Sequence, residues 1–157
     1  MSGPSARDRL DATVRAVERE TPDECQVVGI GWATVDLDRG VAELATALRI
    51  GPEAFLGAPS SVALGARCLV ARGALDGGVA VVLLEPTTEG RLAGRLARHD
   101  EGPAVIWHGA VGMTHLGDPP PPATPGPFGP ERPLSPVPGR PELVRFIVDL
   151  PPGTIPA

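Results

Sequence analysis

The alternation of apolar and polar positions divides the chain into short helices and strands. Over residues 5–20, Leu10, Val14 and Val17 recur at helical spacing, and charged residues occupy the other positions. Ser5 has a side chain suited to a helix N-cap. The pattern therefore predicts an amphipathic helix that buries one face.

Apolar runs and breaker residues predict the elements that follow. In order, they are a buried strand over 26–35, a helix capped by Asp38 and ending near Leu48, a weak extended segment over 53–62, strands over 65–71 and 79–85, a helix over 89–99, a strand over 104–113 and a last strand over 142–150. Asp76-Gly77 lies between the third and fourth strands of this series and is a strong hairpin signal. The predicted order, α, βαβββ, αβ and β, is that of an α+β fold.

Proline is distributed unevenly, and this changes the secondary structure expected for the C-terminal half of the chain. Of 20 Pro residues, 14 follow residue 116, although 42% of the chain is hydrophobic. Such a density excludes helices and central strands. We expect an N-terminal helix over 1–22, a folded body over 23–116, a Pro-rich linker or strap over 117–141, and a C-terminal strand and tail over 142–157.

Charge excludes several classes of function. The chain has 14 basic and 19 acidic residues, and every basic residue is Arg, which excludes a Schiff-base lysine and a P-loop lysine. The Arg residues are scattered, so no nucleic-acid partner is expected. Cys25 and Cys68 fit no zinc motif, and no segment is typical of a membrane span or a signal peptide. We expect a soluble cytoplasmic protein without a cofactor.

Two segments resemble a known superfamily. VGIGWATVDLDRGVAEL at 28–44 is similar to the first strand and helix of vicinal oxygen chelate (glyoxalase-like) proteins. VAVVLLEPTTEGRLAGRLARHDEGPAVIWH at 79–108 looks like the corresponding stretch of methylmalonyl-CoA epimerases. The resemblance implies βαβββ modules that form a curved, mostly antiparallel sheet with a ligand site in its cup. The second module is too short to be complete, so we expect a homodimer as one way to close the cup.

The resemblance also implies where metal ligands would lie. These positions fall on Gly29, Val82 and Val105, whose side chains have no nitrogen, oxygen or sulfur donor for a divalent cation. The sequence therefore predicts no metal. Trp107 shares the face of Val105 and could wall a ligand pocket, or it could simply pack in the core.

A two-residue turn at Asp76-Gly77 would decide which residues of the two adjoining strands point into the cup and which point toward the helices. It places Val82 and Leu84 in the cup together with Leu69, and Arg67 at the rim, where a guanidinium could bind a carboxylate, enolate or phosphate. Cys68 and Val70 would then face the helices. The alternative for Arg67 is a solvated strand end.

Three residues are candidates for acid–base catalysis. His108 and His115 could act as general bases with a pKa near neutrality, and Glu85 could act at the cup margin. The alternatives are a partly exposed histidine at each position, and a helix-capping or solvated role for Glu85.

Together these features favour a metal-independent enzyme. An apolar cup could shape a small apolar or polyketide-like metabolite for cyclisation, isomerisation or elimination. The alternative is a non-catalytic protein that binds or sequesters a small molecule such as a drug. Docking of the Pro-rich segment on another protein is the weakest alternative. The same segment could instead lie as a strap across the open side of the cup.

Overall fold

One curved sheet organises the chain. The computed structural model describes residues 3–21, 25–110, 122–136 and 139–150. The helices are α1 (Ala6–Glu18), α2 (Leu37–Leu48) and α3 (Arg91–Arg98), and the strands are β1 (Cys25–Ala33), β2 (Leu56–Ser61), β3 (Ala66–Ala71), β4 (Ala80–Pro86), β5 (Gly102–Ala110), β6 (Glu131–Leu134) and β7 (Val144–Asp149). In the described residues the strand order is β2-β3-β4-β1-β5-β7-β6. None of the described helices is long and apolar enough to cross a membrane.

The sheet has two related halves that meet at β1 and β5. In the first half, β1 is parallel to β4 and the order βαβββ is complete. In the second half, β5 is parallel to β7, and β6 is the edge strand. The central β1–β5 pair is antiparallel. The α+β fold with a partial second module is therefore confirmed, and the Pro-rich segment supplies the unpredicted strand β6.

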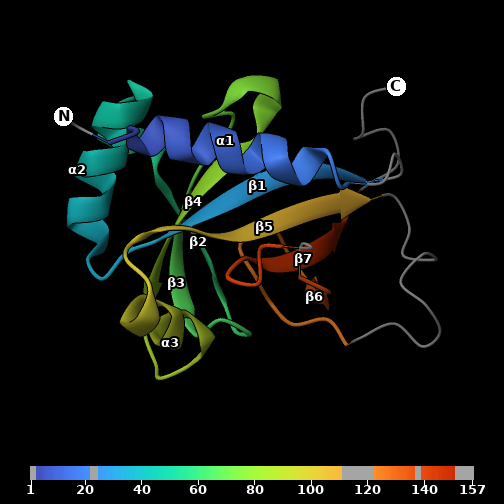
Figure 1. Ribbon diagram of the computed structural model, residues 1–157. Coiled ribbons are helices and arrows are strands. Elements are labelled where there is room, and N and C mark those ends of the chain that lie inside the picture. The colour runs from blue at the N-terminus through green and yellow to red at the C-terminus, as the bar shows by residue number, and fades with distance from the viewer. Residues whose placement is uncertain (1–2, 22–24, 111–121, 137–138, 151–157) are drawn as a thin grey trace.

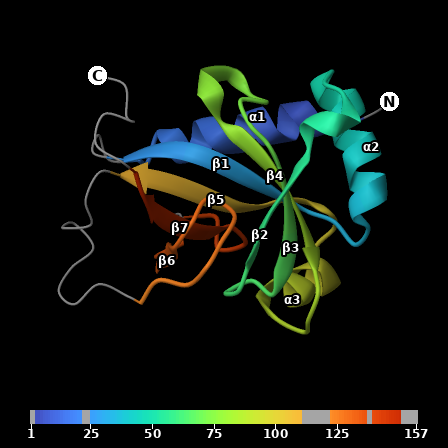
Figure 2. The same cartoon turned by 180° about the vertical axis from the view of Figure 1, so that it is seen from behind.

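The sheet forms an arch with the two long helices outside it. Figures 1 and 2 show β1 and β5 at the crown beneath α1, while β2–β3 and β6–β7 descend on either side. The convex face packs under α1 and α2 through residues such as Leu10, Ile30 and Leu44. The concave face carries a second apolar cluster that includes Val82, Trp107 and Phe146.

Capping residues set where the helices begin. The Ser5 side chain accepts a hydrogen bond from the Asp8 amide at 3.1 Å, and the Asp8 carboxylate accepts one from the Ser5 amide. The predicted cap of the second helix was wrong by two residues. Asp36, rather than Asp38, accepts from the Arg39 amide at 3.2 Å, so α2 begins at Leu37.

The predicted register between β3 and β4 was wrong by one residue. Val70 pairs with Val82, and Leu69 pairs with Leu83. A longer loop joins the strands, and its residues Gly73, Gly77 and Gly78 adopt positive φ angles. A one-residue shift moves every side chain of β3 to the other face. Leu69 therefore packs against the convex cluster, whereas Cys68 and Val70 belong to the concave one.

His108 lies inside the protein rather than at its surface. It follows Trp107 on β5 and so points to the convex side, where it is 1% exposed. Neither ring nitrogen has a hydrogen-bond partner among the described residues. Burial, assisted by the charge of Arg145, lowers the pKa of His108 to about 4. Neither a general base with a near-neutral pKa nor the alternative of a partly exposed histidine fits His108, because β5 is covered on both faces.

Close packing at the crown of the arch predicts the effect of a single methyl group. A Cβ at position 31 would lie 2.6 Å from Leu84 Cδ1 and 3.0 Å from Trp107 Cζ3. We expect Gly31→Ala to lower the free energy of unfolding by roughly 1–3 kcal/mol. Gly57→Ala on edge strand β2 is the control, since its Cβ would meet nothing within 4 Å. Equal denaturation midpoints for the two variants would contradict this packing.

The buried imidazole predicts acid sensitivity. The pKa of His108 is about 4 in the folded protein and near 6.5 in an unfolded chain, so the unfolded chain takes up the proton first. Stability is then lost as pH falls from about 6.5 to 4, by about 3 kcal/mol from this group. Denaturation of wild type and His108→Leu at both pH values should show this difference. An imidazole that is protonated in the folded protein at pH 6, observed by NMR, would refute it.

Candidate functional site

A hairpin from the Pro-rich segment fills the concave face. Residues 124–131, here called the plug hairpin, are held by paired backbone hydrogen bonds. Thr124 and Glu131 exchange bonds of 2.9 and 2.8 Å, and Gly126 and Gly129 exchange two of 3.1 Å, which leaves Pro127 and Phe128 at the tip. Val62 on the opposite arm donates its amide to the Pro125 carbonyl at 3.1 Å. The described part of the Pro-rich segment is thus packed against the concave face.

Phe128 occupies the position in which a side chain of residue 29 would lie. An ideal Cβ at Gly29 would be 2.5 Å from Phe128 Cζ. The Phe128 ring meets Trp107 edge-on at a centroid distance of 5.4 Å, and Trp107 lies over Phe146 at 6.3 Å. The three rings form one aromatic group under the crown of the arch. Gly29 is required here because any larger residue would displace the plug.

Glu131 places a carboxyl group inside this apolar cluster. It is 0% exposed. Oε1 accepts from Trp107 Nε1 at 2.9 Å, and Oε2 accepts from Ser61 Oγ at 2.7 Å. Burial raises the pKa of Glu131, and the two hydrogen bonds oppose that rise. In the part of the chain that the structure describes, no ion pair involves this carboxyl group.

The sequence analysis did not identify Glu131. It lies in a segment that composition marked as a linker, and the proline before it and Pro133 after it hide a strand pattern. One short sequence pattern could have pointed to Glu131. Gly126 and Gly129 flank two residues, which is a turn pattern, and Glu131 is the first acidic residue after it.

Several predicted contact residues do meet at the plug. Val82, Leu84, Val105 and Trp107 are fully buried in the concave cluster, and Gly29 lies beneath Phe128. Their role in contacting a ligand remains a prediction. The placement of Leu69 in the cup was wrong, and His108 points away from it. His115 lies outside the described residues.

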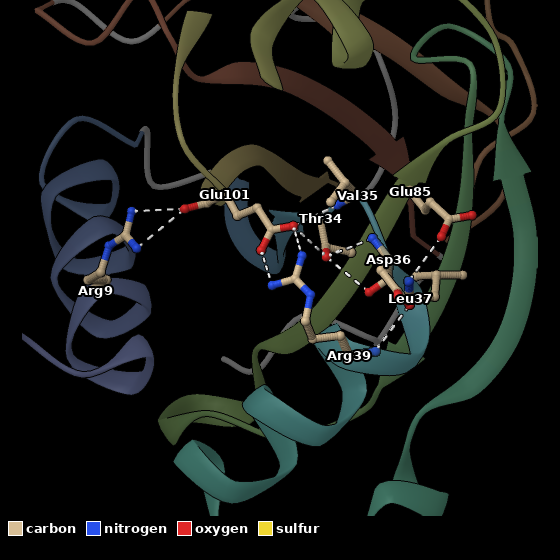
Figure 3. Close-up of polar contacts among 8 residues, drawn as sticks. All are labelled: Arg9, Thr34, Val35, Asp36, Leu37, Arg39, Glu85 and Glu101. Carbon is tan, nitrogen blue, oxygen red and sulfur yellow. Dashed lines mark hydrogen bonds and ion pairs between the residues drawn. The ribbon is translucent and has the colours of Figure 1, made fainter. Parts of the chain in front are cut away.

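Glu85 and Arg67 form a pair at the outer margin of the sheet. Glu85 Oε2 accepts from the Leu37 amide at 3.0 Å (Figure 3). Its Oε1 accepts from Arg67 Nη2. The carboxylate therefore stabilises the start of α2 on the convex side. Glu85 thus has a helix-capping role, but it caps α2 rather than the helix that follows it in the chain. The Arg67 side chain is 58% exposed and directed at this partner. Neither residue reaches the plug hairpin in this arrangement.

Glu101 ties the turn after β1 to the start of β5. Arg39 donates to both of its oxygens at 3.0 and 2.6 Å, the Val35 amide donates at 2.7 Å, and Thr34 Oγ1 donates at 3.0 Å (Figure 3). Burial would raise the pKa of Glu101, but these donors outweigh it and hold that pKa below its usual range. The network fixes a turn and leaves no free carboxylate oxygen for chemistry.

The concave face does not fit a metal of the superfamily type. Gly29, Val82 and Val105 provide no donor atom, and Phe128 fills the space above Gly29. Elsewhere in the described ranges, no three His, Cys, Asp or Glu side chains gather closely enough to hold an ion. Glu131 and its two hydrogen-bond donors form a polar group within this apolar face.

Solved structures share this architecture, although no protein-family model and no curated protein match the sequence. A hypothetical protein from Bacillus halodurans superposes with a TM-score of 0.63 and 17% identity, over 85% of this chain and 100% of the other. A methylmalonyl-CoA epimerase variant from Streptomyces coelicolor, in complex with 2-nitronate-propionyl-CoA, gives 0.63 and 21%, over 83% and 97%. The Mycobacterium tuberculosis methylmalonyl-CoA epimerase gives 0.63 and 14%, over 80% and 88%. The chain therefore has a vicinal oxygen chelate-like fold.

Proposed function

We propose that this protein is a metal-independent enzyme that moves a proton within a small, largely apolar metabolite on the concave face. The observation that carries the proposal is the fully buried Glu131 carboxyl group, surrounded by apolar side chains and bonded to Trp107 and Ser61. A carboxyl group whose pKa is raised by burial is suited to exchange protons near neutral pH. Isomerisation, or cyclisation without loss of mass, is the reaction class that such a group supports best.

The hairpin geometry supports a route by which a substrate could enter. Glu131 belongs to β6, which pairs with β7 through Val148. The tip that carries Phe128 can therefore swing out while Glu131 stays on the sheet. An apolar group of the substrate would then take the place of the Phe128 ring above Gly29 and beside Trp107. Space of this kind, mostly apolar with few polar groups, is typical of small-molecule sites.

The proposed chemistry uses one carboxyl group twice. The Glu131 carboxylate takes a proton from a carbon next to an electron-withdrawing group of the substrate, and it returns that proton to another atom of the same molecule. The Trp107 and Ser61 donors stabilise the ionised carboxylate before the transfer. No atom is gained or lost, so substrate and product have the same mass.

The structural neighbours support the reaction class and a small-molecule partner, but not the same substrate. Several of them are methylmalonyl-CoA epimerases, and one complex holds methylmalonyl-CoA. In this chain, the positions that resemble the metal ligands are Gly29, Val82 and Val105, so we do not propose methylmalonyl-CoA as the substrate. The homodimer and a role in specialised metabolism remain proposals as well.

A second candidate function is non-catalytic binding of a small molecule. It is favoured by the fact that both Glu131 oxygens already have partners and that Phe128 fills the cup. A carboxyl group that only anchors the plug hairpin would look the same. Exchange of the carboxyl for an amide distinguishes the two functions.

Glu131→Gln should abolish turnover without disrupting the fold. The Gln oxygen can accept from Trp107 while its amide donates to Ser61 Oγ. Because general acid–base groups contribute about 10²–10⁴-fold, we expect the product to fall at least ~100-fold. The measurement is a mass-spectrometric metabolite profile of a strain that lacks the gene, complemented with wild type or Glu131→Gln. An accumulated compound of the same mass as the lost product would identify isomerisation.

Glu53→Gln is the matched control, since Glu53 is an exposed carboxylate remote from the plug hairpin. It should restore the wild-type profile. If Glu131→Gln also restores it, Glu131 transfers no proton and the proposed catalysis fails. Unchanged metabolites together with greater self-toxicity in the strain without the gene would instead establish sequestration.

Phe128→Ala should convert the plug into an open site. Removal of the partly exposed ring should lower the free energy of unfolding by about 1–3 kcal/mol, less than for a fully buried Phe. Added indole should enter the space above Gly29, raise the melting temperature and shift the Trp107 Nε1–H resonance. Phe55→Ala removes a ring from the convex core and is the control. A Trp107 signal unmoved by indole in Phe128→Ala would refute an accessible site.

A further inference from the structure

A cationic cleft lies apart from the plug hairpin, at the start of β5 and β7. It has a volume of about 760 Å³ and is walled by α1, α3 and residues 140–143. A smaller hollow of about 350 Å³ continues along α3. Neither is lined by a residue of the plug hairpin. Their size is that of a site for a small molecule.

One side of α3 supplies a row of three guanidinium groups. Arg91, Arg95 and Arg98 are spaced i, i+4 and i+7, so they share a helix face. Leu92 and Leu96, on the other side, pack into the concave cluster. Like charges at these spacings destabilise an isolated helix. The repulsion among these three guanidiniums therefore destabilises α3 unless a negatively charged group outside the helix offsets it.

Arg9 and Arg140 face the same cleft from its other walls. Arg9 lies over the Trp32 ring at 5.0 Å and donates to the Glu101 carbonyl at 3.4 Å. Within the described ranges, none of these five Arg residues forms an ion pair with a carboxylate. A positive charge remains, because the cleft is lined by four of these guanidiniums, with Arg91 in the adjoining hollow, but by only three acidic residues. They are Asp8, Asp100 and Glu142.

Arg95 is held in place with one donor unused. Its Nη1 and Nη2 donate to the carbonyls of Asp100 and Pro103, at 3.0 and 2.7 Å. Its Nε is buried and has no partner among the described residues. Burial lowers the pKa of Arg95, and the neighbouring Glu142 opposes that effect. The backbone carbonyls fix this guanidinium without neutralising its charge, so Arg95 contributes positive charge to the wall of the cleft.

We propose that this cleft binds a small molecule that carries a diphosphate or two phosphate groups. Guanidinium groups donate parallel N–H bonds that match phosphate oxygens, and several of them converge here from three walls. The three acidic residues at the cleft disfavour a long polyanion such as a nucleic acid, which would extend past the Arg row. This inference is independent of the proton-transfer function proposed for Glu131.

Binding of inorganic pyrophosphate to the full chain, measured by calorimetry, tests the proposal. Wild type should bind it, and Arg91→Gln/Arg98→Gln should bind it about tenfold more weakly or worse. Both side chains are exposed, so this variant should fold as wild type does. Arg15→Gln/Arg72→Gln, which removes two exposed charges elsewhere, is the charge-matched control and should bind within about twofold of wild type.

Three outcomes would overturn the inference. Wild type could fail to bind pyrophosphate at millimolar concentration, or the two double variants could lose affinity equally. A single-stranded oligonucleotide could also bind more tightly than pyrophosphate, with the loss confined to the variant at positions 91 and 98. In that case the cleft would be a nucleic-acid surface rather than a small-molecule site. A catalytically inactive Glu131→Gln variant should bind pyrophosphate normally, which separates this test from that of the proposed function.

Discussion

The apolar concave face of the sheet must be covered, and the plug hairpin covers it. Trp107, Phe146 and Val82 are large apolar side chains that a curved sheet would otherwise expose to water. With a short second module, the chain has no further strand or helix in the described residues to place there. Phe128 supplies apolar contact at the centre, and Glu131 fixes the hairpin through its bonds to Ser61 and Trp107. The plug hairpin is thus packed as part of the core.

This arrangement makes binding and stability compete for the same surface. Any ligand that reaches the concave face must replace the contacts that Phe128 makes with Trp107 and Gly29. The observed affinity would be the intrinsic affinity reduced by the fraction of molecules in which the tip is open. Proline limits the freedom of the displaced hairpin, so opening it gains little chain entropy. A ligand must therefore resemble the Phe128 ring in size and polarity to bind well.

The elements with long apolar runs could be predicted from sequence, whereas contacts that depend on loops could not. Strands β1, β4 and β5 were recognisable because their side chains are largely buried on both faces. The face of Leu69 depended on the length of one loop, and a single residue reversed it. Glu131 was missed because its burial comes from Trp107 and Ser61, which are 24 and 70 residues away in the chain. The composition of the residues around Glu131 does not indicate contacts with residues so distant in the chain.

The helix α3 links the two proposed sites, since its two sides face different surfaces. Eight residues are too few for a helix that is stable alone, so α3 depends on Leu92 and Leu96 against the concave cluster. Repulsion among Arg91, Arg95 and Arg98 opposes that packing. An anion in the cleft would reduce this repulsion and so favour the packing of Leu92 and Leu96 in the concave cluster. By reciprocity, a substitution that loosens Leu92 or Leu96 would weaken anion binding, whereas one that keeps their packing, such as Glu131→Gln, would not.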